Sequence, residues 1–465
     1  MKNVFLIMLL LISVVFEGYS QQATPSIANA QNFSLQDCIN YAYEHQDSVK
    51  NATLDLKSAD YKIKETIATG LPQINGSVSF QDYLRTPTAV GPQFKKDPPD
   101  PANPFDPANI ATDLPVQKFP FGVVKYNNTF SATASQLLFS GTFIVGLQAV
   151  KTFKELSQRS LTRTKIETNV AVTKAYYQVL VSNEQIKLLD ANLDQLKQQF
   201  DQTTQQNKQG FAEKIDVDRL DVQYNNLLTT KENTVRSLDL NYQMLKFQMG
   251  MAISQPIVLT DKLEDINLTK QTAETANDTN FYHNRIEYNL LETQLKLYQL
   301  DVKSKKAEFL PTFSANAGFG EVFQENQFKF LYDNVYPNSY VGLSLNIPIF
   351  SSGMRLNQLR QKNIAVMKAQ NDLEDAKNAL NLQANSASIT FYNSLQSLNT
   401  QKRSRELAAE VLRVAKIKYQ QGVGSSIEVT QAQTDFENAD NQYIQALYTA
   451  LISKVDVDKA YGRIK

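Results

Sequence analysis

The chain contains very little of what most enzyme and metal sites require. Its 465 residues include one cysteine, Cys38, and two histidines. Disulfide frameworks and cysteine-based zinc or iron–sulfur sites are excluded, because each needs at least two thiolates from the chain. His45 and His283 lie far apart in the sequence, which leaves little for a histidine-rich metal site or a Ser-His-Asp relay. We therefore expect no enzyme activity and no catalytic, cofactor-binding or metal-binding residue.

The chain also lacks net charge. Its 47 basic side chains are balanced by 47 acidic side chains. A protein that binds duplex nucleic acid or a polybasic protein of the membrane surface needs an excess of positive charge to attract phosphate groups. We therefore expect no nucleic-acid partner.

Long apolar runs are absent except near the first residue. Residues 4–16 are almost all apolar, follow Lys2 and precede Gly18 and Ser20, which suit the −3 and −1 positions of a cleavage site. This run is too short to span a bilayer of about 30 Å, so residues 1–20 are predicted to be a signal peptide. No transmembrane helix is expected after it, and residence in a membrane would then require a β-barrel.

Glycine and proline, the strongest breakers of regular structure, are few and unevenly placed. Nine of the 15 prolines lie between Thr86 and Phe121, which predicts a long irregular loop. Four stretches contain neither residue: 147–209, 211–249, 354–421 and 425–461. At 1.5 Å per residue, the two longest would be helices of roughly 95 to 100 Å, which no compact globule contains.

Apolar residues recur in these stretches with steps of three and four, which is typical of helices that pack along a narrow stripe. Two of the runs are Leu189, Leu193, Leu196, Phe200 and Leu407, Val411, Val414. We interpret the stripes as core seams. The abundant polar residues between them suit a coiled coil or the wall of a water-filled tube.

Four other segments change to a period of two. In 312–320 and 340–349, apolar residues alternate with small or polar residues and no charge occurs. Segments 73–83 and 124–138 show a similar alternation. These patterns predict two hairpins with strands of about ten residues, the length that a tilted transmembrane strand needs. The edge of a soluble sandwich is the alternative for a single hairpin.

The sequence is also an internal duplication. Gly210 returns as Gly422 and Gly250 returns as Gly462, each 212 positions later. Leu71-Pro72 returns as Leu310-Pro311, where each helix is predicted to change to a strand. Each copy therefore reads helix, strand, strand, very long helix, glycine turn and helix.

In this duplicated order of motifs, from about Phe33 to Gly462, the chain resembles the TolC-like outer-membrane efflux protein family. The resemblance implies a mainly α protein with a membrane β-barrel. Long antiparallel coiled-coil helices would form a periplasmic α-barrel, and four strands per protomer would complete a 12-strand β-barrel in a homotrimer. Three copies would also close the sheet, because open strand edges are not tolerated in hydrocarbon.

The resemblance and the breakers together divide the chain into the following segments. They are a signal peptide (1–20), an N-terminal extension (21–33), a first repeat (34–270), a second repeat (271–465) and an equatorial segment (about 251–281). The first repeat would hold strands at about 73–83 and 124–138 and helices at 141–209 and 212–250. The second would hold strands at about 311–322 and 339–350 and helices at 353–421 and 425–461.

Two groups of candidate functional residues follow from the resemblance. A periplasmic gate is expected at Tyr419, Asp216, Glu428 and Gln431. A tip that contacts an adaptor is expected at Gly210, Phe211, Ala212, Gly422, Val423, Gly424 and Ser425. The best-known members carry an arginine at the position of Gly424 and an aspartate at that of Gln431, so the usual salt-bridged lock and double acidic ring are in doubt. Asp216 and Glu428 can also be explained as acidic residues that are favourable near a helix N-terminus.

The function expected from these features is that of an outer-membrane channel-tunnel, extending into the periplasm, in a tripartite efflux or type I secretion system. Its partners would be a periplasmic membrane-fusion adaptor, an inner-membrane pump of RND or ABC type, and outer-membrane lipid. The alternative is a secreted coiled-coil structural protein or adhesin in which the alternating segments form a soluble cap. A periplasmic enzyme has no convergent acid, base and nucleophile to support it.

Overall fold

The computed structural model describes residues 31–86, 88–91, 93–94, 110–111, 115, 117–120, 124–263 and 281–464. The expected signal peptide and residues 21–30 of the expected N-terminal extension lie outside the described residues. Parts of the proline-rich stretch and residues 264–280 of the expected equatorial segment also lie outside them. Among the described residues, no helix combines the length and the hydropathy needed to cross a membrane.

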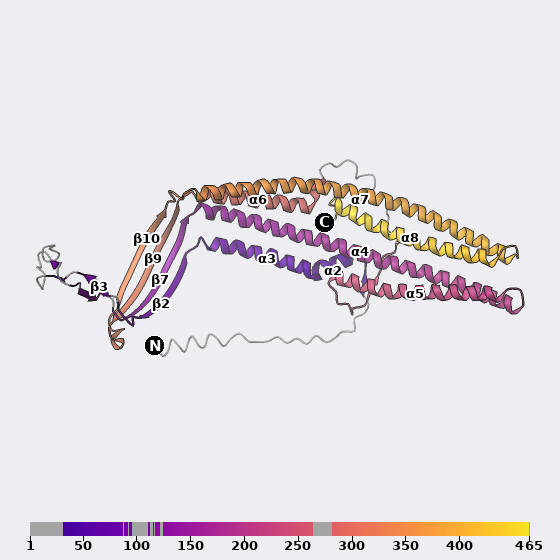
Figure 1. The fold of residues 1–465 in the computed structure, drawn as a ribbon, viewed down its shortest axis with the longest axis horizontal. Coiled ribbons are helices and arrows are strands. Elements are labelled where there is room, and N and C mark those ends of the chain that lie inside the picture. The colour runs from indigo at the N-terminus through magenta and orange to yellow at the C-terminus, as the bar shows by residue number, and fades with distance from the viewer. Residues whose placement is uncertain are drawn as a thin grey trace. The chain divides into compact units, whose positions relative to one another are not determined.

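Four long helices are the largest elements of the fold (Figure 1). They are α4 (Gly141–Lys208), α5 (Lys214–Met249), α7 (Met354–Gln420) and α8 (Ser426–Ala460). Shorter helices are α2 (Leu35–His45), α3 (Asp47–Ala68) and α6 (Ile286–Ala307). The fold is therefore mainly α, as predicted, and the four long helices lie largely within the stretches that lack glycine and proline.

Each of the four long helices is followed by a glycine that adopts a left-handed conformation. Gly210, Gly250, Gly422 and Gly462 have φ values of +81°, +70°, +76° and +66°. At each of them the glycine N–H donates to the carbonyl three residues earlier, and the next N–H donates to a carbonyl five residues before it. This pattern of two hydrogen bonds is the Schellman motif, which satisfies carbonyl groups at a helix end and favours glycine. The duplication in the sequence is thus repeated in backbone geometry.

Four strands form one antiparallel sheet in the order β10-β9-β7-β2. The strands are β2 (Gln73–Asp82), β7 (Tyr126–Phe139), β9 (Thr312–Glu325) and β10 (Tyr336–Asn346). Pairing of β7 with β9 joins the hairpins of the two repeats. Strands β2 and β10 are the two edges of this sheet.

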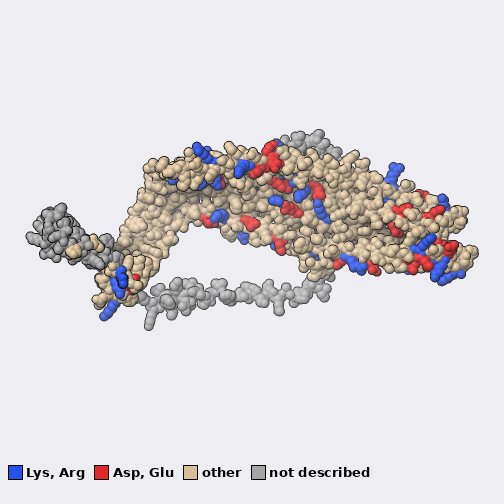
Figure 2. All heavy atoms as spheres, viewed as in Figure 1, with Lys and Arg blue, Asp and Glu red and all other residues tan. Residues whose placement is uncertain are grey.

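The sheet has one apolar face and one polar face. Register places Ile74, Ala134, Ala317 and Val341 in one row across the strands. The row formed by Ser77, Ser131, Gly320 and Asn338 lies on the opposite face, where the Ser77 and Ser131 hydroxyls are 2.7 Å apart. Figure 2 shows almost no charged side chain on the side of the strands in view, whereas charged side chains of both signs are scattered over the helices. The two-residue period of the sequence therefore places apolar and polar side chains on opposite faces of the sheet.

Two predicted strand and loop boundaries are wrong. Strand β10 covers 336–346 instead of 339–350, and β9 extends to 325, so the connection between them is shorter than predicted. The predicted strand included Pro348, which lies beyond the end of β10. A proline has no N–H to donate to a neighbouring strand.

The proline-rich stretch is not wholly irregular either. Strand β3 (Thr88–Gly91) pairs with β6 (Gln117–Pro120), and β4 (Gln93–Phe94) pairs with β5 (Ile110–Ala111). Pro120 occupies a strand end, where the missing N–H costs little. The N-terminal extension is also shorter than predicted, because β1 (Gln31–Phe33) pairs in parallel with β8 (Ile257–Leu259).

The chain divides into two compact units that both repeats share. One comprises 1–46, 168–272 and 394–452, and the other comprises 47–167, 273–393 and 453–465. In the first unit, Leu189, Leu193 and Leu196 of α4 pack against Leu220 and Leu227 of α5, as the periodicity predicted.

The equivalent prediction for α7 is wrong. Leu407, Val411 and Val414 are exposed in the single chain, whereas Leu412 and Ala415 are buried against Val429 and Ala432 of α8. An α-helix turns once in 3.6 residues, so residues one position further along face a different side. Helix α7 therefore carries a second apolar stripe that this chain leaves uncovered.

Candidate functional site

The residues predicted for the tip lie in and beside the turns between α4 and α5 and between α7 and α8. Gly210 and Gly422 each have open space around the position of a Cβ atom, so the left-handed backbone is what favours glycine there. The residue after each glycine is apolar and strongly exposed: Phe211 at 82% and Val423 at 78%. The carbonyl of Ala212 accepts a hydrogen bond from Asn207, which fixes the first turn.

Gly424 and Ser425 have local structural roles. A Cβ atom on Gly424 would lie 2.9 Å from the Cβ of Lys418 and 3.1 Å from the backbone nitrogen of Tyr419. This backbone therefore has no room for the arginine that the resemblance leads one to expect at position 424. The hydroxyl of Ser425 accepts from the backbone N–H of Glu428 and so caps the start of α8.

Two of the four predicted gate residues lie near each other. Asp216, in the first turn of α5, accepts a hydrogen bond from the hydroxyl of Ser426, the first residue of α8. Arg219 lies 3.8 Å from the same carboxylate oxygen, and the carboxylate of Asp216 contributes to the electrostatic environment of Tyr419. The contact between Asp216 and Ser426 therefore joins α5 to α8 through one acidic and one neutral side chain.

Tyr419 lies at the end of α7 and packs on the apolar cluster that joins α7 to α8. Burial raises the pKa of its phenol, and the negative charge of Asp216 raises it further, while a hydrogen bond with Thr203 of α4 acts in the opposite direction. Thr203 is almost completely buried. Tyr419 thus connects α7 with α4 next to the contact between Asp216 and Ser426.

Glu428 and Gln431 are not part of that contact. Both are exposed and line a groove of about 440 Å³ on the α7–α8 pair, whose floor includes Val411, Val414 and Ala432. The side chain of Gln431 donates to Asp435 at 2.9 Å. The structure therefore separates the four predicted gate residues into an inter-helix contact and an exposed polar rim.

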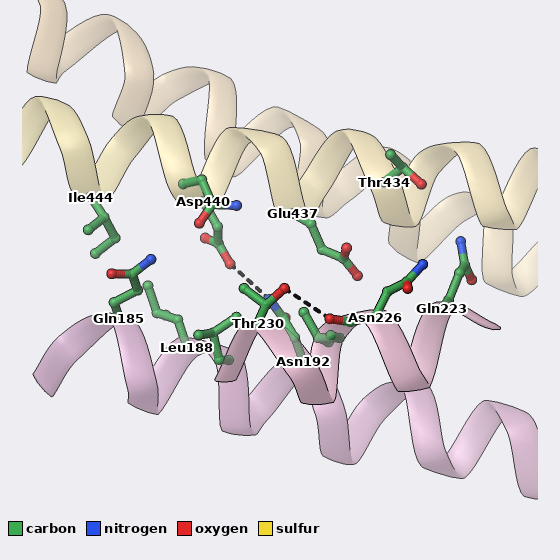
Figure 3. Close-up of a pocket in the computed structure, with 13 residues that line it drawn as sticks. Gln185, Leu188, Asn192, Gln223, Asn226, Thr230, Thr434, Glu437, Asp440 and Ile444 are labelled. Atoms are coloured by element: carbon green, nitrogen blue, oxygen red, sulfur yellow. Dashed lines mark hydrogen bonds between the residues drawn. The ribbon is translucent and has the colours of Figure 1, made fainter. Parts of the chain in front are cut away.

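A second inter-helix contact, which the sequence did not predict, lies further along α8. Asp440 of α8 is buried, accepts from Asn192 of α4 at 3.2 Å and forms an ion pair with Arg405 of α7. Next to it is a cavity of about 240 Å³ between α4, α5 and α8, into which Asn226 and Glu437 also point (Figure 3). Asn192 and Asp440 are 248 positions apart, so no local pattern could have paired them.

Lys416 of α7 is a partly buried cation near this contact. Its ammonium group has no hydrogen-bond partner among the described residues. Burial lowers the pKa of Lys416 to about 8, against the opposing effect of the Glu437 carboxylate. Burial also raises the pKa of Glu437, although its hydrogen bond with Gln433 lowers it. The protein therefore holds these two groups where charge is unfavourable.

We expect the stability contributed by this position to increase with pH. Unfolded lysine keeps its proton to about pH 10.4, whereas folded Lys416 releases it at about 8, so the unfolded state binds more protons between these values. Thermal unfolding followed by helical circular dichroism should show the melting temperature of the wild type rising relative to that of Lys416→Met across this window. Below pH 8 the variant should be more stable by about 1–2 kcal/mol, after allowance for partial exposure.

Lys418→Met, at an exposed position of the same helix, controls for the loss of a lysine. If the melting temperatures of the wild type and Lys416→Met changed in parallel with pH, Lys416 would have an ordinary protonation equilibrium, and this prediction would be contradicted.

Paired long helices joined by glycine turns, and a sheet with one apolar and one polar face, are the features expected of the outer-membrane channel class. The chain belongs to the outer membrane efflux protein family, whose model matches residues 38–250 and 289–463. Membership of this family locates the protein in the outer membrane, with its helices extending into the periplasm. The alternative of a secreted structural protein or adhesin is not supported.

Individual relatives agree with this family. The chain is 24% identical over 306 residues to outer membrane protein TolC of Escherichia coli, covering 62% of this chain and 60% of TolC. It is 24% identical over 304 residues to alkaline protease secretion protein AprF of Pseudomonas aeruginosa, covering 64% of this chain and 60% of AprF. The matched region thus spans less than two thirds of each of these relatives.

A solved structure extends the similarity to nearly the whole fold. The open state of the MtrE outer membrane channel of Neisseria gonorrhoeae superposes with a TM-score of 0.69 at 15% identity. The superposition covers 97% of this chain and 95% of MtrE. At this identity the likeness concerns the fold alone.

Proposed function

We propose that this protein is the outer-membrane channel-tunnel of a tripartite efflux or type I secretion system and acts as a passive exit duct. The observation that carries the proposal is the four-stranded sheet, which has an apolar face, a polar face and two open edges. Open edges are not tolerated in hydrocarbon. Strands β2 and β10 run antiparallel to each other in the sheet order, so β10 of one copy can pair with β2 of the next.

In this proposal three copies close a 12-strand barrel. The apolar rows would face lipid, and the polar rows would line a water-filled pore, as in other transmembrane barrels. The exposed stripe of Leu407, Val411 and Val414 would be covered by a neighbouring copy, since an apolar stripe of this kind favours helix packing. The helices of the three copies would then form the wall of a periplasmic tunnel. A duct of this kind requires no enzyme activity.

The gate would act at the tip of the α-helices. We propose that the contact between Asp216 and Ser426, together with Tyr419, holds the two hairpins of one protomer together in a closed state. Glu428 and Gln431 would form a polar rim that selects for cations by focusing the field of three carboxylates. Because Gly424 has no room for a larger side chain, this latch would not use an arginine.

The tip would also be the docking surface for a periplasmic membrane-fusion adaptor, which in turn contacts an inner-membrane pump of RND or ABC type. Exposed Phe211 and Val423 beside backbone turns are suited to such a contact, with Gly210, Ala212, Gly422, Gly424 and Ser425 completing the surface. The cargo is not fixed by this design. The names of its relatives include both efflux proteins and an alkaline protease secretion protein.

Cross-linking of strand edges tests the trimer. A cysteine at Ser77 in β2 is combined in turn with one at Asn338, Tyr340 or Gly342 in β10, all on the polar face. The native Cys38 is fully buried, and burial raises the pKa of its thiol to about 12, so it does not compete. We expect at least one pair to give covalent dimers and trimers in outer membranes after oxidation.

A positive control comes from the same sheet. Ser77 and Ser131 face each other within one chain, so the variant with cysteines at both should form an intramolecular disulfide without oligomers. Oxidation of that control with no oligomer from any edge pair would refute the closed trimeric barrel.

Photo-cross-linking from Phe211 and Val423 in living cells tests the tip. We expect a periplasmic adaptor among the products, identified by mass spectrometry, and no such product from the matched exposed position Tyr61 on α3. Capture of the adaptor from Tyr61 but from neither tip position would show that the docking surface lies elsewhere.

A further inference from the structure

Aromatic side chains gather at the end of the apolar sheet face that is distal to the helices. They come from β2, β7, β9 and the connection 326–335 between β9 and β10. We call the following six residues the aromatic collar: Phe80, Tyr126, Phe130, Phe323, Phe328 and Tyr332. The ring centroid of Phe328 lies 5.5 Å from that of Tyr126 and 6.1 Å from that of Phe80. Phe323 contacts Phe130 at 5.8 Å and Tyr332 at 5.2 Å, so aromatic contacts extend across the strands.

The connection 326–335 is folded back onto the sheet and does not project from it. The side chain of Asn326 accepts from the backbone N–H of Lys125 at 3.1 Å. The hydroxyl of Tyr332 accepts from the buried amide of Asn128 at 2.7 Å, and Leu331 is completely buried. A buried amide without a partner is costly, so the contact with Asn128 fixes the position of Tyr332. Figure 1 shows this orange connection beside the ends of β2 and β7.

The folded connection nevertheless leaves much of the collar uncovered. Phe328 is 58% exposed and Tyr332 is 56% exposed. Below the collar, the exposed apolar surface continues along the strands through Val78 and Ile74. A contiguous apolar surface of this kind marks an interaction site. Aromatic rings with a polar tip favour the boundary between hydrocarbon and water, where one end is apolar and the other is hydrated.

Two lysines accompany the collar. The ammonium group of Lys125 lies 4.9 Å from the ring centroid of Tyr126, and that of Lys329 lies 5.5 Å from that of Phe330. Lysines placed in this way can lay their methylene groups on aromatic surface and extend the charge toward anionic groups. At the boundary between hydrocarbon and water, the phosphates of lipid head groups supply such anionic groups.

We propose that the aromatic collar is a lipid-interface anchor, in which connection 326–335 lies among phosphorylated lipid head groups of the membrane leaflet at this end of the barrel, with Lys125 and Lys329 on the phosphates. The proposal rests on the proposed function, because it requires the apolar sheet face to contact lipid. It assigns to this connection a role in fixing how deep the barrel sits in the membrane.

Single tryptophan substitutions test the depth, because the chain has no tryptophan of its own. Phe328→Trp reports on the collar, Leu343→Trp on the middle of the apolar face, and Phe211→Trp on the helix tip. Each full-length variant is reconstituted into phosphatidylcholine and phosphatidylglycerol vesicles that carry bromine at shallow or deep acyl positions. We expect shallow bromine to quench the emission of the Phe328→Trp variant more strongly than deep bromine does. Deep bromine should quench the Leu343→Trp variant more strongly, and neither should quench the Phe211→Trp variant.

The outcomes separate the two proposals. Quenching of the Leu343→Trp variant without quenching of the Phe328→Trp variant would overturn the anchor and leave the channel proposal intact. Loss of quenching in both variants would overturn lipid contact of the sheet, and the proposed function with it.

The number of lipid molecules retained by the protein tests the role of the positive charges of Lys125 and Lys329. Native mass spectrometry of the protein released from the same lipids should show fewer retained phosphatidylglycerol molecules for the double variant Lys125→Gln and Lys329→Gln than for the wild type. Lys377→Gln is the matched control, because Lys377 also lies over an aromatic ring, that of Tyr282, but on helix α7. Equal retention by the double variant and the wild type would remove the two lysines from the anchor.

Discussion

An Arg285→Met variant should unfold with a free energy about 3–5 kcal/mol lower than that of the wild type, because it removes a buried guanidinium group that pairs with the partly buried carboxylate of Glu287. The Arg285 side chain is only 3% exposed. It binds Glu287 through two nitrogens at 3.0 Å, Gln383 at 3.2 Å and the carbonyl of Ala460 at 2.8 Å. Methionine would fill similar volume but leave Glu287 and the last turn of α8 without these donors.

Denaturant unfolding of the purified protein, followed by circular dichroism, measures this loss. Arg285→Lys should fall between the Arg285→Met variant and the wild type, because an ammonium group cannot reproduce the planar fork that binds Glu287. Arg163→Met is the matched control: Arg163 is half exposed and contacts Glu167 one turn away, a surface pair worth at most about 1 kcal/mol. Equal losses for Arg285→Met and Arg163→Met would show that the buried network adds nothing.

An Asp216→Ala variant should spend a larger fraction of time open in planar-bilayer recordings. A hydrogen bond to a charged group contributes about 1.5–3 kcal/mol, so its loss shifts a two-state equilibrium by about 10- to 150-fold. Ser426→Ala removes the other partner of the same contact and should have a similar effect. The two changes together should add little to either one, because they remove one interaction.

Asp218→Ala is the control for this experiment. Asp218 lies on the same turn of α5, is exposed and carries the same charge. If Asp218→Ala opened the channel as much as Asp216→Ala, the effect would come from the charge of the tip, and the contact with Ser426 would have no gating role.

Much of the fold could be predicted because its signals are local. A left-handed backbone needs glycine, so the helix ends at Gly210 and Gly422 are visible in the sequence, and helices without breakers are visible from composition. The two faces of the sheet follow from a period of two. The limits of β10 were less predictable, because the alternation continues through Ile347 and Ile349 after the pairing ends.

Contacts between distant segments were the part that sequence patterns could not supply. Asp216 and Tyr419 were predicted by resemblance, but the partner of Asp216 is a serine 210 positions away. Asp440 and its two partners come from three helices and carry no shared motif. Periodicity also detects that α7 has an apolar stripe but does not tell which partner the stripe faces. Leu407 and Val411 were therefore predicted to lie in a core seam, although the single chain leaves them exposed.

The nearly equal lengths of the repeated helices constrain how this protein can change in evolution. Helices α4 and α7 have 68 and 67 residues, and α5 and α8 have 36 and 35. One inserted residue lengthens a helix by about 1.5 Å and rotates everything beyond it by about 100°. A viable insertion must therefore restore the packing stripe and occur in all four helices. We expect the helices of homologous chains to differ in length by multiples of about seven residues, matched in both repeats.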